Sequence, residues 1–182
     1  MYVSVDQYYP GLGPLEVKTN INCIGGNGSI SGGYGGYVEL YAKEDITLSG
    51  NVNCSAGDGT GSNSDGGNAN FYSTYVYSTN NVNISGTFTY EGGVGTGSGT
   101  GGNGGEIYAY AGARLTSTAT FNFTGGASSA AAGTGGDGGY IDLFSNRYPT
   151  SYTKTWNVSG GAAHNDGTDG YVYVDWVCLA HP

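Results

Sequence analysis

Apolar and polar residues alternate along short segments of this chain, and most of these segments follow a run of glycines. In residues 37–41 and 140–144 every second side chain is aliphatic, which is the period of a β-strand with one buried face. Segments of this kind begin near residues 2, 37, 68, 106, 140 and 171, so they lie 31 to 38 residues apart. Periods of this length are typical of stacked repeats, each of which buries its apolar face against its neighbours.

Each repeat contains two further short strand-like segments. The first begins near residues 15, 46, 82 and 115, with a poor fifth copy at 150–152, and the second begins near residues 20, 51, 87, 120 and 155. Apolar side chains match from repeat to repeat in columns, of which two are Val3, Val38, Ala69, Ile107, Ile141, Val172 and Ile21, Val52, Phe88, Phe121, Trp156. Coils stacked about 4.8 Å apart bring such matching side chains into contact.

These columns predict an all-β chain that forms a single domain over residues 1–182. The expected fold is a right-handed parallel β-helix (β-solenoid) of about five coils, with three short strands per coil and Gly-rich loops. An antiparallel sandwich or barrel would also show short strands with turn signals, but it predicts no equivalence of columns at a period near 35 residues. The glycine loops could be disordered tips, or they could stack on one another as polyproline-II-like segments.

The composition excludes several classes of function. The net charge is −9, and the basic residues are only Lys18, Lys43, Arg114, Arg147 and Lys154. Because these five are scattered, no basic patch for nucleic acid is expected. No run of 18 apolar residues could cross a bilayer. The residues after Met1 do not form a signal peptide, so we expect that any leader is absent from this chain.

The order of strand, glycine, strand, Gly-Gly loop, Gly-Gly, strand resembles the glycine-rich β-helical repeats of microbial surface proteins, adhesins and fibre proteins. The resemblance runs from Leu15 to Asp175. It implies an extracellular or cell-surface location and a role in adhesion, sheath or fibre formation. It supplies no catalytic motif.

The outward side chains of the longest strand of each coil are mainly aromatic and acidic. The predicted interaction face consists of Tyr37, Tyr41, Tyr72, Tyr108, Tyr110, Tyr140, Tyr171 and Tyr173. A contiguous aromatic face is typical of a contact surface for protein or for sugar rings. The intrinsic preference of tyrosine for strands is an alternative explanation of these columns, but among the surfaces of this chain the face is the best candidate for an interaction site.

Two cysteines and five sequons are candidates for covalent modification. Cys23 and Cys54 occupy equivalent inward positions in consecutive coils, at a spacing that suits either a disulfide or two packed free thiols. Cys178 is the unpaired third cysteine. The N-glycosylation sequons are at Asn27, Asn53, Asn83, Asn122 and Asn157, and their use would require a secreted protein of suitable origin.

Outward threonines and asparagines of the third strand form ladders that resemble the ice-binding faces of some antifreeze proteins. The ladders are Asn20, Asn51, Thr87, Thr120, Thr155 and Asn22, Asn53, Thr89, Asn122, Asn157. Threonine favours strands and asparagine stacks into amide ladders, so the pattern also has a purely structural explanation.

Acidic residues suggest neither a cofactor nor an active site. Asp58, Asp65, Asp137, Asp166 and Asp169 lie in the glycine loops, where they could ligate calcium or simply form turns. Glu39 and Asp142 share a column three coils apart, about 14 Å at the usual strand spacing. Such a separation does not suit a pair of catalytic carboxylates, so we expect no enzyme, no metal site and no other cofactor.

The sequence therefore favours a non-enzymatic extracellular structural protein that assembles with itself. Head-to-tail stacking into a homopolymer, filament or surface layer would use Tyr2, Val3 and Val5 at one end and Val172 and Val174 at the other. The alternative is a surface adhesin that binds glycans through its tyrosines.

Overall fold

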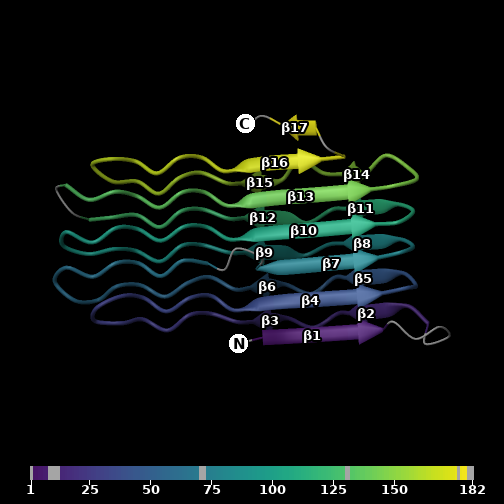
Figure 1. The fold of residues 1–182 in the computed structure, drawn as a ribbon, viewed down its shortest axis with the longest axis horizontal. Helices are drawn as coiled ribbons and strands as arrows, with labels where there is room; N and C mark the ends of the chain where they lie inside the picture. The colour runs from purple at the N-terminus through teal and green to yellow at the C-terminus, as the bar shows by residue number, and fades with distance from the viewer. Residues whose placement is uncertain (1, 8–12, 70–72, 130–131, 176, 180–182) are drawn as a thin grey trace.

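The computed structural model describes residues 2–7, 13–69, 73–129, 132–175 and 177–179, and shows a parallel β-solenoid of about five coils. Each coil contributes one strand to each of three sheets (Figure 1). Sheet A contains β1 (Tyr2–Gln7), β4 (Tyr37–Ala42), β7 (Thr74–Ser78), β10 (Glu106–Ala111), β13 (Tyr140–Ser145), β16 (Tyr171–Val174) and β17 (Val177–Leu179). The all-β solenoid with three strands per coil is thus confirmed.

The two other sheets are built from shorter strands. Sheet B contains β2 (Leu15–Val17), β5 (Ile46–Leu48), β8 (Val82–Ile84), β11 (Leu115–Ser117) and β14 (Ser151–Tyr152). Sheet C contains β3 (Ile21–Asn22), β6 (Val52–Asn53), β9 (Thr87–Thr89), β12 (Thr120–Asn122) and β15 (Trp156–Asn157). The part of the chain that the structure describes contains no helix long and apolar enough to cross a membrane.

Side chains from the three sheets meet in one core that runs along the solenoid. Val38, Ile107, Ile141 and Val172 are completely buried in one column of sheet A, and Val52, Phe88 and Phe121 are buried in a column of sheet C. The parallel register places each residue directly beside its counterpart in the next coil, for example Phe121 beside both Phe88 and Trp156. Contact between identical positions is the reason that the apolar pattern repeats along the sequence.

The third copy of the long strand was predicted to begin at residue 68, and this is wrong. β7 begins at Thr74, and Thr74 pairs with Val38 and Ile107 in the column assigned to Ala69. Ala69 is still buried, but in the segment before the strand. Hydrogen bonds and strand register make Ala69 equivalent to Gly35, and Ser73 equivalent to Tyr37. Three residues separate Ala69 from Ser73, whereas one residue separates Gly35 from Tyr37. The two additional residues displace the start of the strand.

Thr74 places a hydroxyl group inside an apolar column, and the residue that follows β9 in the same coil supplies its partner. The Thr74 hydroxyl forms a hydrogen bond with the phenol of Tyr90, which is fully buried. A buried hydroxyl without a partner costs roughly 1–3 kcal/mol. The two polar groups therefore satisfy one another, and the core tolerates both.

The glycine-rich segments extend from the strands as a long arm, in which every coil runs outward and returns (Figure 1). Backbone hydrogen bonds join the outgoing and returning segments of successive coils into one continuous series. The N–H of each glycine donates to the carbonyl of the one before it in the order Gly26, Gly33, Gly57, Gly67, Gly93, Gly102, Gly126, Gly136, Gly161, Gly167. The arm is stacked in the way expected of polyproline-II-like segments, which have no internal hydrogen bonds.

Close approach between backbones explains why these positions are glycine. A Cβ atom on Gly102 would lie 1.7 Å from the carbonyl oxygen of Gly67, and one on Gly136 would lie 1.9 Å from that of Gly102. Neither glycine has a positive φ, so the constraint is the space between segments and not the backbone conformation.

The strands at the two ends of sheet A differ. β1 pairs with β4, whereas β17 turns back and pairs antiparallel with β16 (Figure 1). Asp175, with a φ of 48°, makes this reversal, in a conformation that Asp adopts more readily than most residues. Val172 and Val174, predicted as assembly residues, point into the core, whereas Tyr2 is 53% exposed and Val3 and Val5 are partly buried.

Candidate functional site

The outer face of sheet A carries the densest group of aromatic side chains among the described residues. We call this group the tyrosine face; it comprises Tyr37, Tyr41, Tyr75, Tyr77, Tyr108, Tyr110, Tyr140, Tyr171 and Tyr173. The register aligns Tyr41, Tyr77, Tyr110 and Phe144 in one column. Seven of the eight predicted tyrosines lie on this face, and the eighth, Tyr72, lies outside the described residues.

Tyr75 and Tyr77 belong to the face but were not predicted. Tyr77 takes the position beside Tyr41 that the sequence pattern had given to Tyr72, and Tyr75 lies beside Glu39, because β7 begins at Thr74. The segment Thr74–Ser78 alternates in the same way as the other copies and would have revealed them.

Rings in adjacent coils stack on one another along the face. The ring centroids of Tyr75 and Tyr108 are 5.0 Å apart with planes 11° from parallel, and those of Tyr77 and Tyr110 are 5.0 Å apart at 9°. Stacked rings cover each other's faces, so their edges and hydroxyl groups are what remains for solvent. The hydroxyls of Tyr77 and Tyr110 form no hydrogen bond with any described residue, so both are available to a ligand.

Glu106, which is buried, and Asp142, which is partly buried, form a carboxyl pair next to the tyrosine face. Glu106, at the start of β10, is only 5% exposed, and it shares a hydrogen bond with Asp142 on β13. Burial, this hydrogen bond and the charge of Asp142 raise the pKa of Glu106 from 4.5 to about 8. Burial also raises the pKa of Asp142, against the effect of its hydrogen bond to Glu106. The pair therefore holds a proton near neutral pH.

The raised pKa makes the stability of the fold depend on pH. Glu106 titrates at a higher pH in the folded chain than in the unfolded chain, so its contribution is fully present below about pH 4.5 and is lost as the pH rises to about 8. We expect the free energy of unfolding to fall by about 2–4 kcal/mol across this range in the wild type, and much less in Glu106→Gln. Urea unfolding at several pH values measures this difference.

Glu44→Gln is the matched control for that experiment. Glu44 is exposed, so its substitution removes the same formal charge without touching the Glu106–Asp142 pair. Equal pH dependence of Glu106→Gln and Glu44→Gln would contradict the proton-sharing pair.

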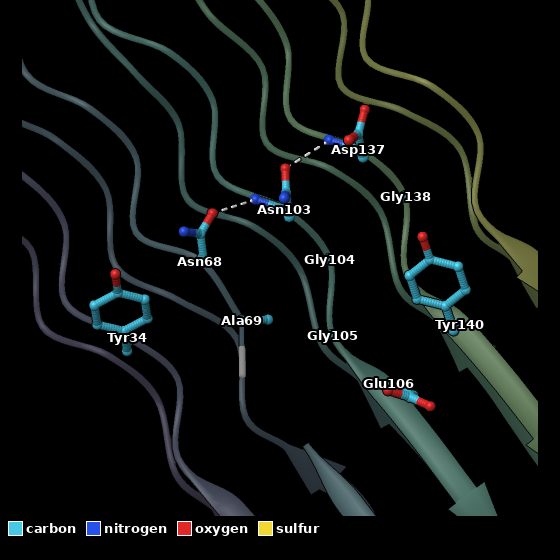
Figure 2. Close-up of a pocket in the computed structure, with 10 residues that line it drawn as sticks. All are labelled: Tyr34, Asn68, Ala69, Asn103, Gly104, Gly105, Glu106, Asp137, Gly138 and Tyr140. Carbon is cyan, nitrogen blue, oxygen red and sulfur yellow. Dashed lines mark hydrogen bonds between the residues drawn. The ribbon is translucent and has the colours of Figure 1, made fainter. Parts of the chain in front are cut away.

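A pocket of about 340 Å³ opens where the returning glycine segments enter β10 and β13 (Figure 2). It is lined by Tyr34, Asn68, Ala69, Asn103, Gly104, Gly105, Glu106, Asp137, Gly138 and Tyr140. The sequence did not predict this pocket, since its lining comes from four separate segments, one from each of four coils. Its polar wall is a ladder that crosses three coils.

Each side chain of the ladder holds the backbone of the next coil. The Asn103 N–H donates to Asn68 Oδ1 at 2.7 Å, and the Asp137 N–H donates to Asn103 Oδ1 at 2.9 Å (Figure 2). Hydrogen bonds from the hydroxyl and backbone of Thr168 lower the pKa of Asp137 below its ordinary value. The ladder thus fixes the amide groups in place and keeps a carboxylate at the pocket.

The two candidate disulfide cysteines are free thiols in the structure. Cys23 and Cys54 are both buried in the core. Burial is the main cause that raises the pKa of the Cys54 thiol, and the neighbouring Cys23 raises it further. The side chain of Cys178 lies outside what the structure describes.

The sequons differ in how accessible their asparagines are. Asn27, Asn83 and Asn157 are exposed, whereas Asn53 and Asn122 are partly buried. The Asn122 side-chain amide donates to Glu91. The outward Asn/Thr ladder of sheet C is also hydrogen-bonded within the protein. Asn20 and Asn51 accept hydrogen bonds from the backbone of the next coil at 3.0 and 2.9 Å.

The acidic residues of the glycine arm serve as hydrogen-bond acceptors for the backbone. Asp58, Asp65, Asp137, Asp166 and Asp169 each accept a backbone N–H at 2.8–3.0 Å. Over the described ranges, no three side chains of His, Cys, Asp or Glu lie close enough together to hold a metal ion. Glu39 accepts the hydroxyl of Tyr2 at 2.7 Å, on the same face as Asp142.

The fold and this face define the protein as a parallel β-solenoid with a tyrosine-rich outer surface. Comparison with known proteins finds no matching family model, curated protein or solved structure.

Proposed function

We propose that this protein is a non-enzymatic extracellular β-solenoid that binds glycans through its tyrosine face. The observation that supports this proposal is the stacking of the rings, with Tyr77 and Tyr110 nearly parallel and their hydroxyls unengaged. A ligand that meets this face contacts a row of phenol groups, which both donate and accept hydrogen bonds. Glycans offer the matching array of hydroxyl groups.

The same geometry argues against two other kinds of partner. Protein interfaces need an apolar centre, but here the apolar ring faces cover one another. A polyanion would need cations, yet the charged side chains on this outer side of sheet A are all acidic, and none of its described residues is basic; they are Asp6, Glu39, Glu106 and Asp142. A neutral or cationic glycan suits the face best.

Removal of two hydroxyls tests the proposal without disturbing the fold. In Tyr77→Phe/Tyr110→Phe the stacked rings remain, and only the two phenol oxygens are lost. Each hydrogen bond contributes about 0.5–1.5 kcal/mol, so we expect retention on the glycans that bind the wild type to weaken roughly 5- to 100-fold. A glycan array followed by titration of the best ligand measures the change.

A substitution on another face provides the control. Asn83 is exposed on β8 of sheet B, so Asn83→Ala should leave glycan retention unchanged. The proposal fails if the wild type retains no glycan, or if the double Phe variant binds as tightly as the wild type with the same circular-dichroism spectrum.

Head-to-tail assembly stays a prediction. β17 pairs with the outer edge of β16. Another copy that stacked on this end of sheet A would have to pair a parallel strand with the same edge. This arrangement favours the adhesin over the filament as the function.

A further inference from the structure

The pocket beside the tyrosine face has the size of a site for one sugar ring. Its volume of about 340 Å³ lies at the lower end of the range for small-ligand sites. Tyr34, which is 71% exposed, and Tyr140 supply aromatic rings near the two ends of the Asn68–Asn103–Asp137 ladder (Figure 2). The pocket and the tyrosine face share Tyr140, so one glycan chain could occupy both.

The pocket is acidic. Glu106 and Asp137 line it, Asp142 is hydrogen-bonded to Glu106, and no lysine, arginine or histidine is among the described lining residues. Aromatic rings add to the attraction for a cation, because the face of each ring carries partial negative charge. A positively charged group is therefore preferred over a neutral one.

One buried oxygen of Glu106, a residue that lines the pocket, lacks a partner. Glu106 Oε2 is buried and forms no hydrogen bond with the described residues. Burial of an unpaired carboxyl oxygen is unfavourable, and a ligand with N–H donors would satisfy it. The ladder shows where the rest of such a ligand would lie: the Oδ1 atoms of Asn68 and Asn103 hold the backbone, which leaves their Nδ2 groups to donate to sugar hydroxyls.

We propose that this pocket binds the protonated amino group of an amino sugar against the Glu106 carboxyl, with the sugar hydroxyls on the side-chain amides of Asn68 and Asn103. This proposal rests on the proposed glycan-binding function and specifies one residue of the ligand. The titratable groups around the ammonium are Glu106, Asp137, Tyr34 and Tyr140 at the pocket, with Asp142 behind Glu106.

Binding of the ammonium should release a proton. The Glu106–Asp142 pair holds one proton in the free protein, because its pKa is raised. An adjacent positive charge favours the ionised form, so the shared O–H bond breaks, the electron pair stays on the carboxylate and the proton passes to solvent. The amine arrives already protonated and keeps its own proton.

Two oligosaccharides that differ only in acetylation test the inference. Isothermal titration calorimetry at pH 6 would compare a glucosamine tetramer with the N-acetylglucosamine tetramer, in two buffers of different ionisation enthalpy. We expect the wild type to bind the glucosamine tetramer at least tenfold more tightly and to release protons on binding it. Glu106→Gln should abolish both the preference and the proton release, while binding of a neutral glycan by the tyrosine face remains.

Two further variants control for general charge and for folding. Glu44→Gln makes the same substitution at an exposed position on another part of the chain and should keep the preference. Tyr34→Ala alters a side chain that is mostly in solvent, so it should fold normally and still reduce the preference several-fold. If Glu106→Gln does not fold, the Tyr34→Ala result decides whether the pocket is the source of the preference for the glucosamine tetramer.

The outcomes separate this inference from the proposed function. Equal affinity of the wild type for both tetramers, or an unchanged preference in Tyr34→Ala and Glu106→Gln, overturns the amino-sugar site alone. Absence of binding to any glycan overturns both proposals. A preference that Glu44→Gln also abolishes identifies general charge attraction and overturns the pocket as its source.

Discussion

Gly102→Ala is expected to destabilise the protein by about 3 kcal/mol or more, or to prevent folding. The Cβ atom would lie 1.7 Å from the Gly67 carbonyl oxygen and 2.5 Å from its carbon. Both are backbone atoms, so no side chain can rotate to make room. Gly102 also donates its N–H to Gly93 and accepts one from Gly126, so any shift spreads into the neighbouring coils.

Gly26→Ala is the matched control. Gly26 belongs to the same series of hydrogen bonds, since its carbonyl accepts the Gly33 N–H, but a Cβ atom there would meet nothing within 4 Å. We expect a change of at most about 0.5 kcal/mol, measured by urea unfolding. Hydrogen exchange should show lost protection in the arm of Gly102→Ala only. Similar stability of the two variants would contradict the close packing of the arm.

The stacked solenoid was predictable because its three strands repeat the same inward positions. The inward columns of sheet C, which contain Phe88 and Phe121, were assigned from alternation alone, and the register confirms them. In a parallel stack, equivalent residues touch, so similarity along the sequence translates directly into contacts.

The error in the third coil has a simple physical cause. Most coils carry two glycine doublets on the returning segment, such as Gly101-Gly102 and Gly104-Gly105. The hydrogen bonds place Gly67 beside Gly57, at the position that Gly102 takes beside Gly93. Gly66-Gly67 is therefore the first doublet, although the sequence pattern had treated it as the second, directly before a strand.

The pocket and the hairpin at the end of sheet A depend on contacts that no local pattern contains. Glu106 and Asp142 lie on different strands, and their pairing is diagonal, because the residue directly beside Glu106 is Tyr140. The reversal after β16 depends on one positive φ at Asp175. Alternation identifies strands and their faces, but it carries no information about diagonal neighbours or about the direction of a final strand.

Phe121→Ala is expected to lower the free energy of unfolding by roughly 3–5 kcal/mol, the usual range for a buried aromatic side chain. Phe121 is 1% exposed, and its ring centroid lies 5.5 Å from that of Phe88 and 5.7 Å from that of Phe123. Its truncation removes one ring contact with the preceding coil and one within its own coil, and leaves a cavity that flanking coils, held by backbone hydrogen bonds, cannot close. Phe121→Leu, which keeps most of the volume, should cost about 1.5 kcal/mol or less, and Thr120→Ala, on the exposed side of the same strand, about 0.5 kcal/mol or less. Urea unfolding with an unchanged denaturant dependence measures all three, and a loss below about 1 kcal/mol in Phe121→Ala would mean that this column does not support the stack.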